Sequence, residues 1–187
     1  MDFRLVTYVA ILLFLTGSAA FAQEQDFESI LRFEFEGAEK GETLHGWGGG
    51  PAETIHFDST IVHGGSGAAR LERDADSPGG FTTITKRLEI DFSGQWIELR
   101  GFLRTEGVNR YAGLWLRQDG PSGELQFDNM HDQGLRGTTG WTEYTIRLPL
   151  DKNAGELFFG ALVGGEGTIW VDDLQLLVDG EPIQQAK

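Results

Sequence analysis

The sequence has no cysteine and only four histidines among its 187 residues. Without thiols, the chain can form no disulfide bond, use no cysteine nucleophile and supply no thiolate ligand to zinc or an iron–sulfur cluster. Basic residues are also scarce, because 15 lysines and arginines stand against 29 acidic residues, for a net charge of −14. A surface of this sign repels phosphate backbones and anionic lipids, so we expect no nucleic-acid partner and no membrane-surface role.

Helical periodicity is missing as well, since no stretch after residue 22 repeats apolar residues at helical spacing beyond two turns. Proline is rare, with five residues, whereas glycine is abundant, with 27. Together with 11% aromatic residues, this composition is typical of a folded, turn-rich β protein and not of a disordered chain.

The single long apolar run lies at the start of the chain. Arg4 precedes an apolar segment over residues 5–15, which is too short to span a bilayer. Ala20-Phe21-Ala22 then matches the small-x-small cleavage pattern. The sequence therefore predicts a signal peptide over residues 1–22, cut after Ala22, and a secreted or periplasmic product that is not inserted in the membrane. An uncleaved anchor or a buried core helix is the alternative.

Short segments of alternating polarity fill residues 23–187, which we expect to form a single domain. The run Asp119-Gly120-Pro121-Ser122-Gly123 predicts a hairpin turn, and the nearly all-apolar segment 157–163 predicts a buried central strand. About ten strands at this regular spacing are typical of an all-β antiparallel β-sandwich of the jelly-roll kind. The expected strands are 31–36, 54–57, 68–73, 81–90, 96–104, 111–117, 125–129, 141–148, 157–163 and 169–178.

One hairpin carries side chains suited to a polar ligand. In residues 111–117 the leucines are expected to face the core, which turns Trp115 and Arg117 outward. In the partner segment, Leu125 and Phe127 are expected to point inward. An aromatic ring, a guanidinium, an amide and a carboxylate on one concave face are typical of sugar recognition. The candidate ligand-binding residues are Trp115, Arg117, Gln126 and Asp128, with Asn129 at the margin and Trp47 at the rim.

Each of these assignments has a structural alternative. Trp115 could cover the second face of the sandwich, while Arg117 and Asp128 form a cross-strand ion pair. Trp47, in its glycine-rich loop, could anchor that loop in the core. We expect the remaining strand-end tryptophans to fill the core: Trp96, Trp141 and Trp170.

Several short motifs resemble a known fold. They are Phe35-Glu36, Gly46-Trp47, the turn His63-Gly64-Gly65-Ser66-Gly67 and the closing Trp170-Val171-Asp172-Asp173-Leu174. In this order they resemble the galactose-binding-like β-sandwich, and within it carbohydrate-binding modules of the cellulose- and xylan-binding kind. A second set of motifs follows in order: Tyr111–Arg117, Phe127-Asp128-Asn129-Met130, Arg136-Gly137-Thr138-Thr139-Gly140-Trp141 and Phe159-Gly160. Over residues 101–173 these motifs more tightly resemble a non-catalytic domain found in secreted tail-specific peptidases, erythromycin-esterase-like proteins and some regulators. That resemblance implies an accessory role without naming a ligand.

The resemblance to carbohydrate-binding modules also implies a structural Ca²⁺ ion. In that sandwich a starting glutamate, carbonyls of the serine–glycine turn and an aspartate of the last strand hold the ion, and such oxygens suit a hard cation. The matching positions are Glu36 and Asp172, with Gly64 and Ser66 as carbonyl donors. The alternative is a pair of solvated carboxylates on an acidic surface.

No catalytic signature is present. The serines lack a Gly-x-Ser-x-Gly context, the histidines lack metal-ligand spacing, and no Glu-x-Asp-x-x-Glu run occurs. We therefore expect not an enzyme but an exported binding module for a carbohydrate or other polar ligand. The alternatives are a protein-interaction or structural domain at the cell envelope and a glycoside hydrolase with an acid pair.

Overall fold

The computed structural model describes residues 32–33, 35 and 46–183. As the sequence predicts, these residues form an all-β antiparallel structure whose helical content is two short 3₁₀ turns. None of the described helices is long and apolar enough to cross a membrane. The elements are β1 (Arg32–Phe33), β2 (Gly48–Gly50), η1 (Ala52–Thr54), β3 (Ile55–Asp58), β4 (Ala68–Arg73), β5 (Phe81–Glu89), β6 (Trp96–Gly120), β7 (Gly123–Asp128), η2 (His131–Gln133), β8 (Leu135–Pro149), β9 (Glu156–Gly164), β10 (Gly167–Val178) and β11 (Glu181–Pro182).

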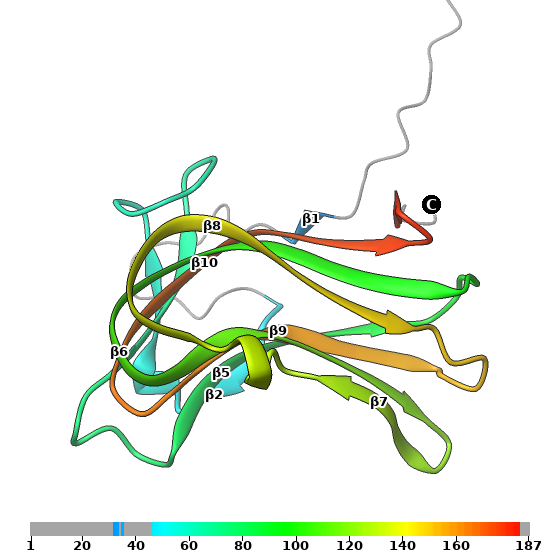
Figure 1. The fold of residues 1–187 in the computed structure, drawn as a ribbon, viewed down its shortest axis with the longest axis horizontal. Helices are drawn as coiled ribbons and strands as arrows, with labels where there is room; N and C mark the ends of the chain where they lie inside the picture. Colours follow the sequence, from blue (N-terminus) through cyan, green and yellow to red (C-terminus); the bar gives the residue numbers. More distant parts are fainter. Residues whose placement is uncertain (1–31, 34, 36–45, 184–187) are drawn as a thin grey trace, which may run out of the picture.

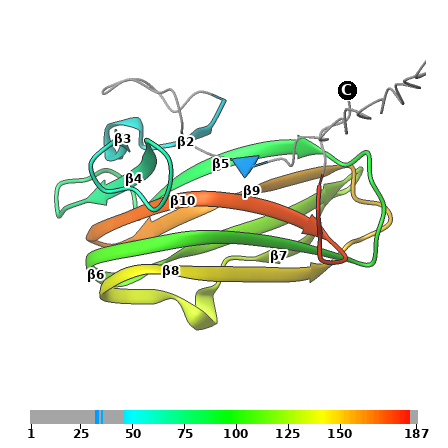
Figure 2. The same cartoon turned by 90° about the horizontal axis from the view of Figure 1, so that it is seen from above.

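The strands form two layers, which Figure 1 shows one above the other. The lower sheet has the order β7, residues 111–120 of β6, β9, β5 and β2. The upper sheet has the order β8, residues 96–106 of β6, β10, β4 and β3, and both β1 and β11 pair with β10. Seen from above in Figure 2, β10, β6 and β8 lie side by side.

Strand β6 joins the two layers. Its 25 residues would extend roughly 80 Å if straight, far more than one layer of a domain this size needs. The strand bends near Gly107, which adopts a left-handed φ of 61° that favours glycine. Its pairing with β8 shifts register three times around this bend. The sequence predicts two strands here, 96–104 and 111–117, and the structure has one, because the bend lets the strand continue into the other layer.

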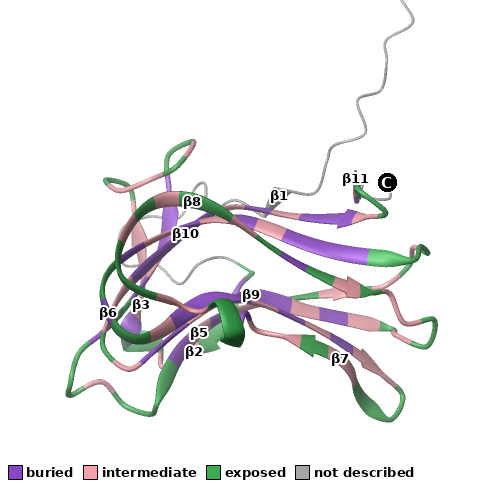
Figure 3. Cartoon of the chain, in the orientation of Figure 1, coloured by how far each residue is buried: buried purple, intermediate pink, exposed green. Residues whose placement is uncertain are grey.

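The core lies between the layers, where inward side chains of both halves of β6 meet. Leu99 and Leu103 come from the upper half and Leu114 and Leu116 from the lower half, and all four are fully buried. Phe159 of β9 packs in the same cluster. Figure 3 shows the resulting alternation of buried and partly exposed residues along β6, β9 and β10. The central place predicted for 157–163 is confirmed, since β9 lies between β5 and β6.

Candidate ligand-binding face

Trp115 lies on the outer face of the lower sheet. It stands opposite Gly160 of β9, and Gly160 in turn stands opposite Thr85 of β5. The indole Nε1 donates hydrogen bonds to Thr83 Oγ1 at 2.9 Å and to the Ile84 carbonyl at 3.2 Å. Because Thr83 and Ile84 belong to β5, two strands away from Trp115, the ring must lie along the sheet across β9. A Cβ atom at position 160 would lie 2.0 Å from the Ile84 carbonyl oxygen, so this close approach of β9 and β5 requires glycine.

Next to Trp115, four side chains lie in one row across the lower sheet. Phe127 of β7 pairs with Arg117 of β6, which pairs with Phe158 of β9, which pairs with Arg87 of β5. The Arg117 guanidinium lies over the Phe158 ring, 5.0 Å from its centroid, and donates to Asp119 Oδ2 at 2.7 Å. Phe127 is 47% exposed. The row thus presents the exposed ring of Phe127 beside the hydrogen-bond donors of Arg117 and Arg87, which suits a ligand with C–H faces and hydroxyl groups.

The predicted outward orientation of Gln126 and Asp128 is wrong. Gln126 pairs with the fully buried Gln118, and Asp128 pairs with the fully buried Leu116. Since directly opposed residues share one face of a sheet, both side chains lie on the inward side of β7. Asp128 Oδ1 accepts a hydrogen bond from the Met130 N–H at 2.7 Å, and the ion pair of Arg117 is with Asp119 and not with Asp128.

A β-bulge causes this inversion. The hairpin closes with Gly120 opposite Gly123, but the register shifts by one residue between Gln118 and Asp119. Without the extra residue, Gln126 would stand opposite Arg117, as the sequence predicts. A shift of one residue moves every later side chain of a strand to the other face. Phe127 therefore replaces Gln126 and Asp128 on the ligand-binding face.

The two remaining predicted ligand residues take different positions. The Asn129 carboxamide oxygen accepts the N–H of His131, the first residue of η2, at 3.2 Å and so is engaged within the protein. The rim position predicted for Trp47 is wrong, because its side chain is only 9% exposed. Trp47 packs against Phe35 and Phe159, at 5.1 and 6.0 Å between ring centroids, as an anchor in the core.

Tyr111 closes one end of the face. Its hydroxyl donates to the Asn129 carbonyl, and its ring lies edge-on to His131. Burial, and to a smaller extent the charge of Asp128, raises the pKa of Tyr111 to about 12. The phenol therefore keeps its proton at physiological pH and serves as a donor that fixes the segment after β7.

The described part of the predicted calcium site centres on Asp172, which is 1% exposed. Its Oδ2 accepts the backbone N–H groups of His63 (2.8 Å) and Gly64 (3.1 Å), and its Oδ1 accepts that of Asp173 (2.8 Å). Burial raises the pKa of Asp172, although these three bonds oppose the shift. A carboxylate has about four lone-pair sites, so one remains for a cation. Glu36 lies outside the described residues, and the ion stays a prediction that also names Gly64 and Ser66.

The sequence assigns three tryptophans to the core, and all three lie on the outer face of the upper sheet. The assignment is wrong for Trp96 and Trp141, whereas Trp170 is buried as predicted. Trp96 is 37% exposed, and the Arg147 guanidinium lies 4.5 Å from its ring centroid. Trp141 contacts the ring of His63. Trp170 is buried, but beneath Arg104 and beside Asp58, which accepts its Nε1 hydrogen at 2.9 Å.

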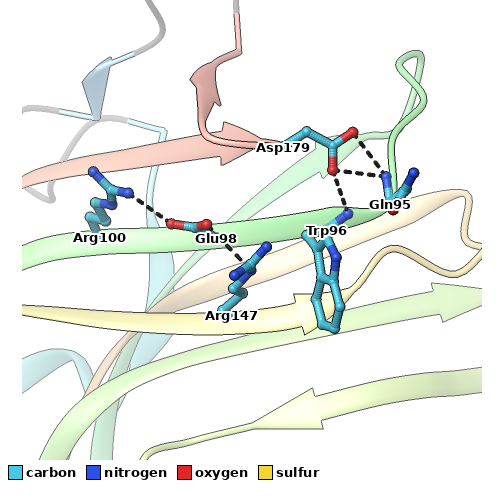
Figure 4. Close-up of polar contacts among 6 residues, drawn as sticks. All are labelled: Gln95, Trp96, Glu98, Arg100, Arg147 and Asp179. Atoms are coloured by element: carbon cyan, nitrogen blue, oxygen red, sulfur yellow. Dashed lines mark hydrogen bonds and ion pairs between the residues drawn. The ribbon is translucent and has the colours of Figure 1, made fainter.

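An ion network runs along β6 on the same face, and Figure 4 shows it. Glu98 lies between two guanidinium groups, 2.9 Å from Arg100 and 3.4 Å from Arg147. At the strand start, the Asp179 carboxylate accepts the backbone N–H groups of Gln95 and Trp96. The network fixes the side chains of this face through contacts within the protein.

Comparisons with known proteins identify a relative in sequence and several solved structures with a similar fold. No family model matches the chain. A curated relative, the uncharacterized HTH-type transcriptional regulator YbfP of Bacillus subtilis (strain 168), is 32% identical over 136 residues, which are 69% of this chain. The match spans 46% of that protein, so the chain corresponds to about half of its length.

Several solved structures of carbohydrate-binding modules share the fold. The xylan-binding domain of family 22 matches with a TM-score of 0.60 and 14% identity over 84% of this chain and 99% of its own. The CBM22-1 xylan-binding domain of Paenibacillus barcinonensis Xyn10C matches with a TM-score of 0.53 and 12% identity over 85% and 97%. At these identities the likeness establishes the fold, which is the β-sandwich of carbohydrate-binding modules.

Proposed function

We propose that this chain is an exported, non-catalytic carbohydrate-binding domain whose ligand lies on the outer face of the lower sheet. The observation that carries the proposal is the fixed indole of Trp115. Its ring is held along the sheet by Thr83 and Ile84, beside the row of Phe127, Arg117 and Phe158. A ring that is already ordered loses little conformational entropy when a sugar stacks on it.

Charge supports a neutral glycan over an acidic one. Arg117 is paired with Asp119 and Arg87 with Glu156, so the two guanidinium charges of the row are balanced. The whole chain carries a net charge of −14, which repels polyanions. The shared fold with xylan-binding modules supports the same ligand class. Export is supported by the sequence pattern of residues 1–22.

The test is retention of the mature chain on insoluble xylan, cellulose, mannan and β-galactan. We expect retention on at least one polysaccharide, its loss in Trp115→Ala, and its persistence in Trp96→Ala, which removes an exposed tryptophan from the opposite face. Phe127→Ala is a second variant, because a side chain 47% exposed is not needed for folding. Failure of the wild-type chain to bind any of the four, or equal retention of all variants, would contradict the proposal.

A second candidate function is recognition of a signal or of a protein partner. It is favoured by the match to a transcriptional regulator, in which a domain of this kind accompanies a further segment of the protein. Under this function the polysaccharides fail to retain the chain. A photo-crosslinking residue at position 127 then captures a protein at the exposed face instead of a glycan.

A further inference from the structure

A pocket lies on the opposite side of the molecule from Trp115. It is a depression of about 310 Å³ on the outer face of the upper sheet. Arg100 and Phe102 of β6 contribute to its lining, together with Glu143 of β8 and Gln175 of β10. His63 and Asp173 complete the wall. Its volume is at the lower end of ligand pockets in proteins, which is sufficient for one sugar-sized ring.

The His63 wall of this pocket is fixed in position. The imidazole stacks on Phe102, with centroids 3.5 Å apart and planes 13° apart, and its edge meets Trp141. Its Nδ1 lies 2.5 Å from Asp173 Oδ2. The loop backbone at His63 and Gly64 is bound by the buried carboxylate of Asp172. The loop at residues 63–64 and the upper sheet therefore form one rigid rim around the pocket.

The backbone of β10 is distorted at this point. Asp173 has a φ of 50°, which is uncommon for a residue other than glycine, and the register of β10 with β6 shifts between Asp172 and Gln175. The bulge turns the Asp173 carboxylate toward His63 and the pocket. Bulges that re-aim a side chain, and residues held at unusual φ values, are concentrated at binding and active sites.

The polar groups of the pocket select the class of ligand. Arg100 is an N–H donor whose charge is already engaged by Glu98, as Figure 4 shows, and Asp173 is engaged by His63. Glu143 offers further acceptors, and the Gln175 amide both donates and accepts. Hydroxyl groups also donate and accept, so they match this mixture, whereas an anion would be repelled by the carboxylates of Glu143 and Asp173. We infer that this pocket binds a single polyhydroxylated ring that carries no negative charge, independently of the Trp115 face.

The experiment titrates the isotope-labelled mature chain with D-glucose, D-galactose, D-mannose and D-xylose and follows the backbone amides of His63, Phe102 and Glu143 by NMR. We expect a saturable shift of these amides with at least one neutral sugar. We also expect a dissociation constant at least tenfold higher in Glu143→Ala or in Gln175→Ala. D-Glucuronate is titrated in parallel and is expected to bind more weakly than the neutral sugars.

Two control variants separate this pocket from the Trp115 face. Glu106→Ala removes an exposed glutamate from the same face of β6 outside the pocket and is expected to bind as the wild type does. Trp115→Ala is expected to lose polysaccharide retention and keep the monosaccharide shifts. Melting temperatures within a few degrees of wild type establish that each variant is folded. The inference is overturned if no neutral sugar gives a saturable shift, if D-glucuronate binds as tightly, or if Glu143→Ala and Gln175→Ala both bind normally.

Discussion

The two outer faces of the sandwich carry similar side chains in similar rows and use them differently. On the lower sheet, Arg117 lies over Phe158, and Phe127 beside it remains 47% exposed. On the upper sheet, Arg104 lies over Trp170, but that ring is buried and hydrogen-bonded to Asp58. The loop that follows Asp58 places His63 on Phe102. Stacked guanidinium–aromatic pairs thus stabilise the fold where a loop closes over them, and offer a surface where rings stay exposed.

The largest expected effect comes from breaking the attachment of that loop. Asp172→Ala leaves three backbone N–H groups of the loop and bulge without their acceptor. Because hydrogen bonds to a buried carboxylate are strong, we expect the free energy of unfolding to fall by about 3 kcal/mol. We also expect faster proteolytic cleavage within residues 59–67. Urea unfolding and limited proteolysis measure the two effects.

The matched control is Asp173→Ala, which removes the neighbouring carboxylate. In the described part of the chain, the Asp173 carboxylate forms an ion pair with the partly exposed imidazole of His63. Its expected cost is about 1 kcal/mol or less. Equal losses in the two variants would mean that the loop is held by the side chain of His63 and not through its backbone.

Removal of calcium is the next test of the upper sheet. If the predicted ion binds at Glu36, Asp172 and the carbonyls of Gly64 and Ser66, a chelator removes a ligand that binds only the folded chain. At a concentration 100-fold above its dissociation constant such a ligand stabilises by about 2.7 kcal/mol. For a chain of this size the melting temperature is then expected to fall by about 5 to 10 °C. An unchanged melting temperature, with no metal found by elemental analysis, excludes the ion.

On the lower sheet, Thr83→Val tests whether the indole of Trp115 is held in place. Valine keeps the shape of threonine but removes the oxygen that accepts the Nε1 hydrogen at 2.9 Å. We expect a loss of stability of about 1 kcal/mol, because the Ile84 carbonyl still accepts. Polysaccharide affinity is expected to fall several-fold. Thr85→Val is the control on the same strand and face, and an equal effect on affinity there would show that Thr83 has no positioning role.

The sequence predicts the sandwich well and its surface less well. Strand periodicity locates β4 at its observed bounds and β9 at the centre, since burial on one side imposes alternation. It also turns Trp115 and Arg117 outward correctly. It misses Phe127 because the bulge at Gln118–Asp119 depends on hydrogen bonds between strands, which leave no mark in local polarity. It misses the pocket at His63 for a similar reason, because the contact with Asp173 joins residues 110 positions apart.

The smallest expected effect is a pH dependence at Asp58, where the covering loop begins. Burial by itself raises the pKa of Asp58, but the Trp170 indole, the N–H groups of Thr60 and Ile61, and the charge of Arg70 outweigh it, so the pKa is lowered. A lowered pKa means that the charged carboxylate stabilises the folded chain above pH 4, and that this contribution is lost as the pH falls below the ordinary value of 3.8. The difference in thermal unfolding between wild type and Asp58→Asn should therefore be largest at pH 6 and shrink as the pH falls below 3.8. If the difference does not change with pH, Asp58 acts through shape and neutral hydrogen bonds. The contact between Asp58 and Trp170 would then not depend on charge, and the outer faces of the two sheets would differ less in their electrostatics.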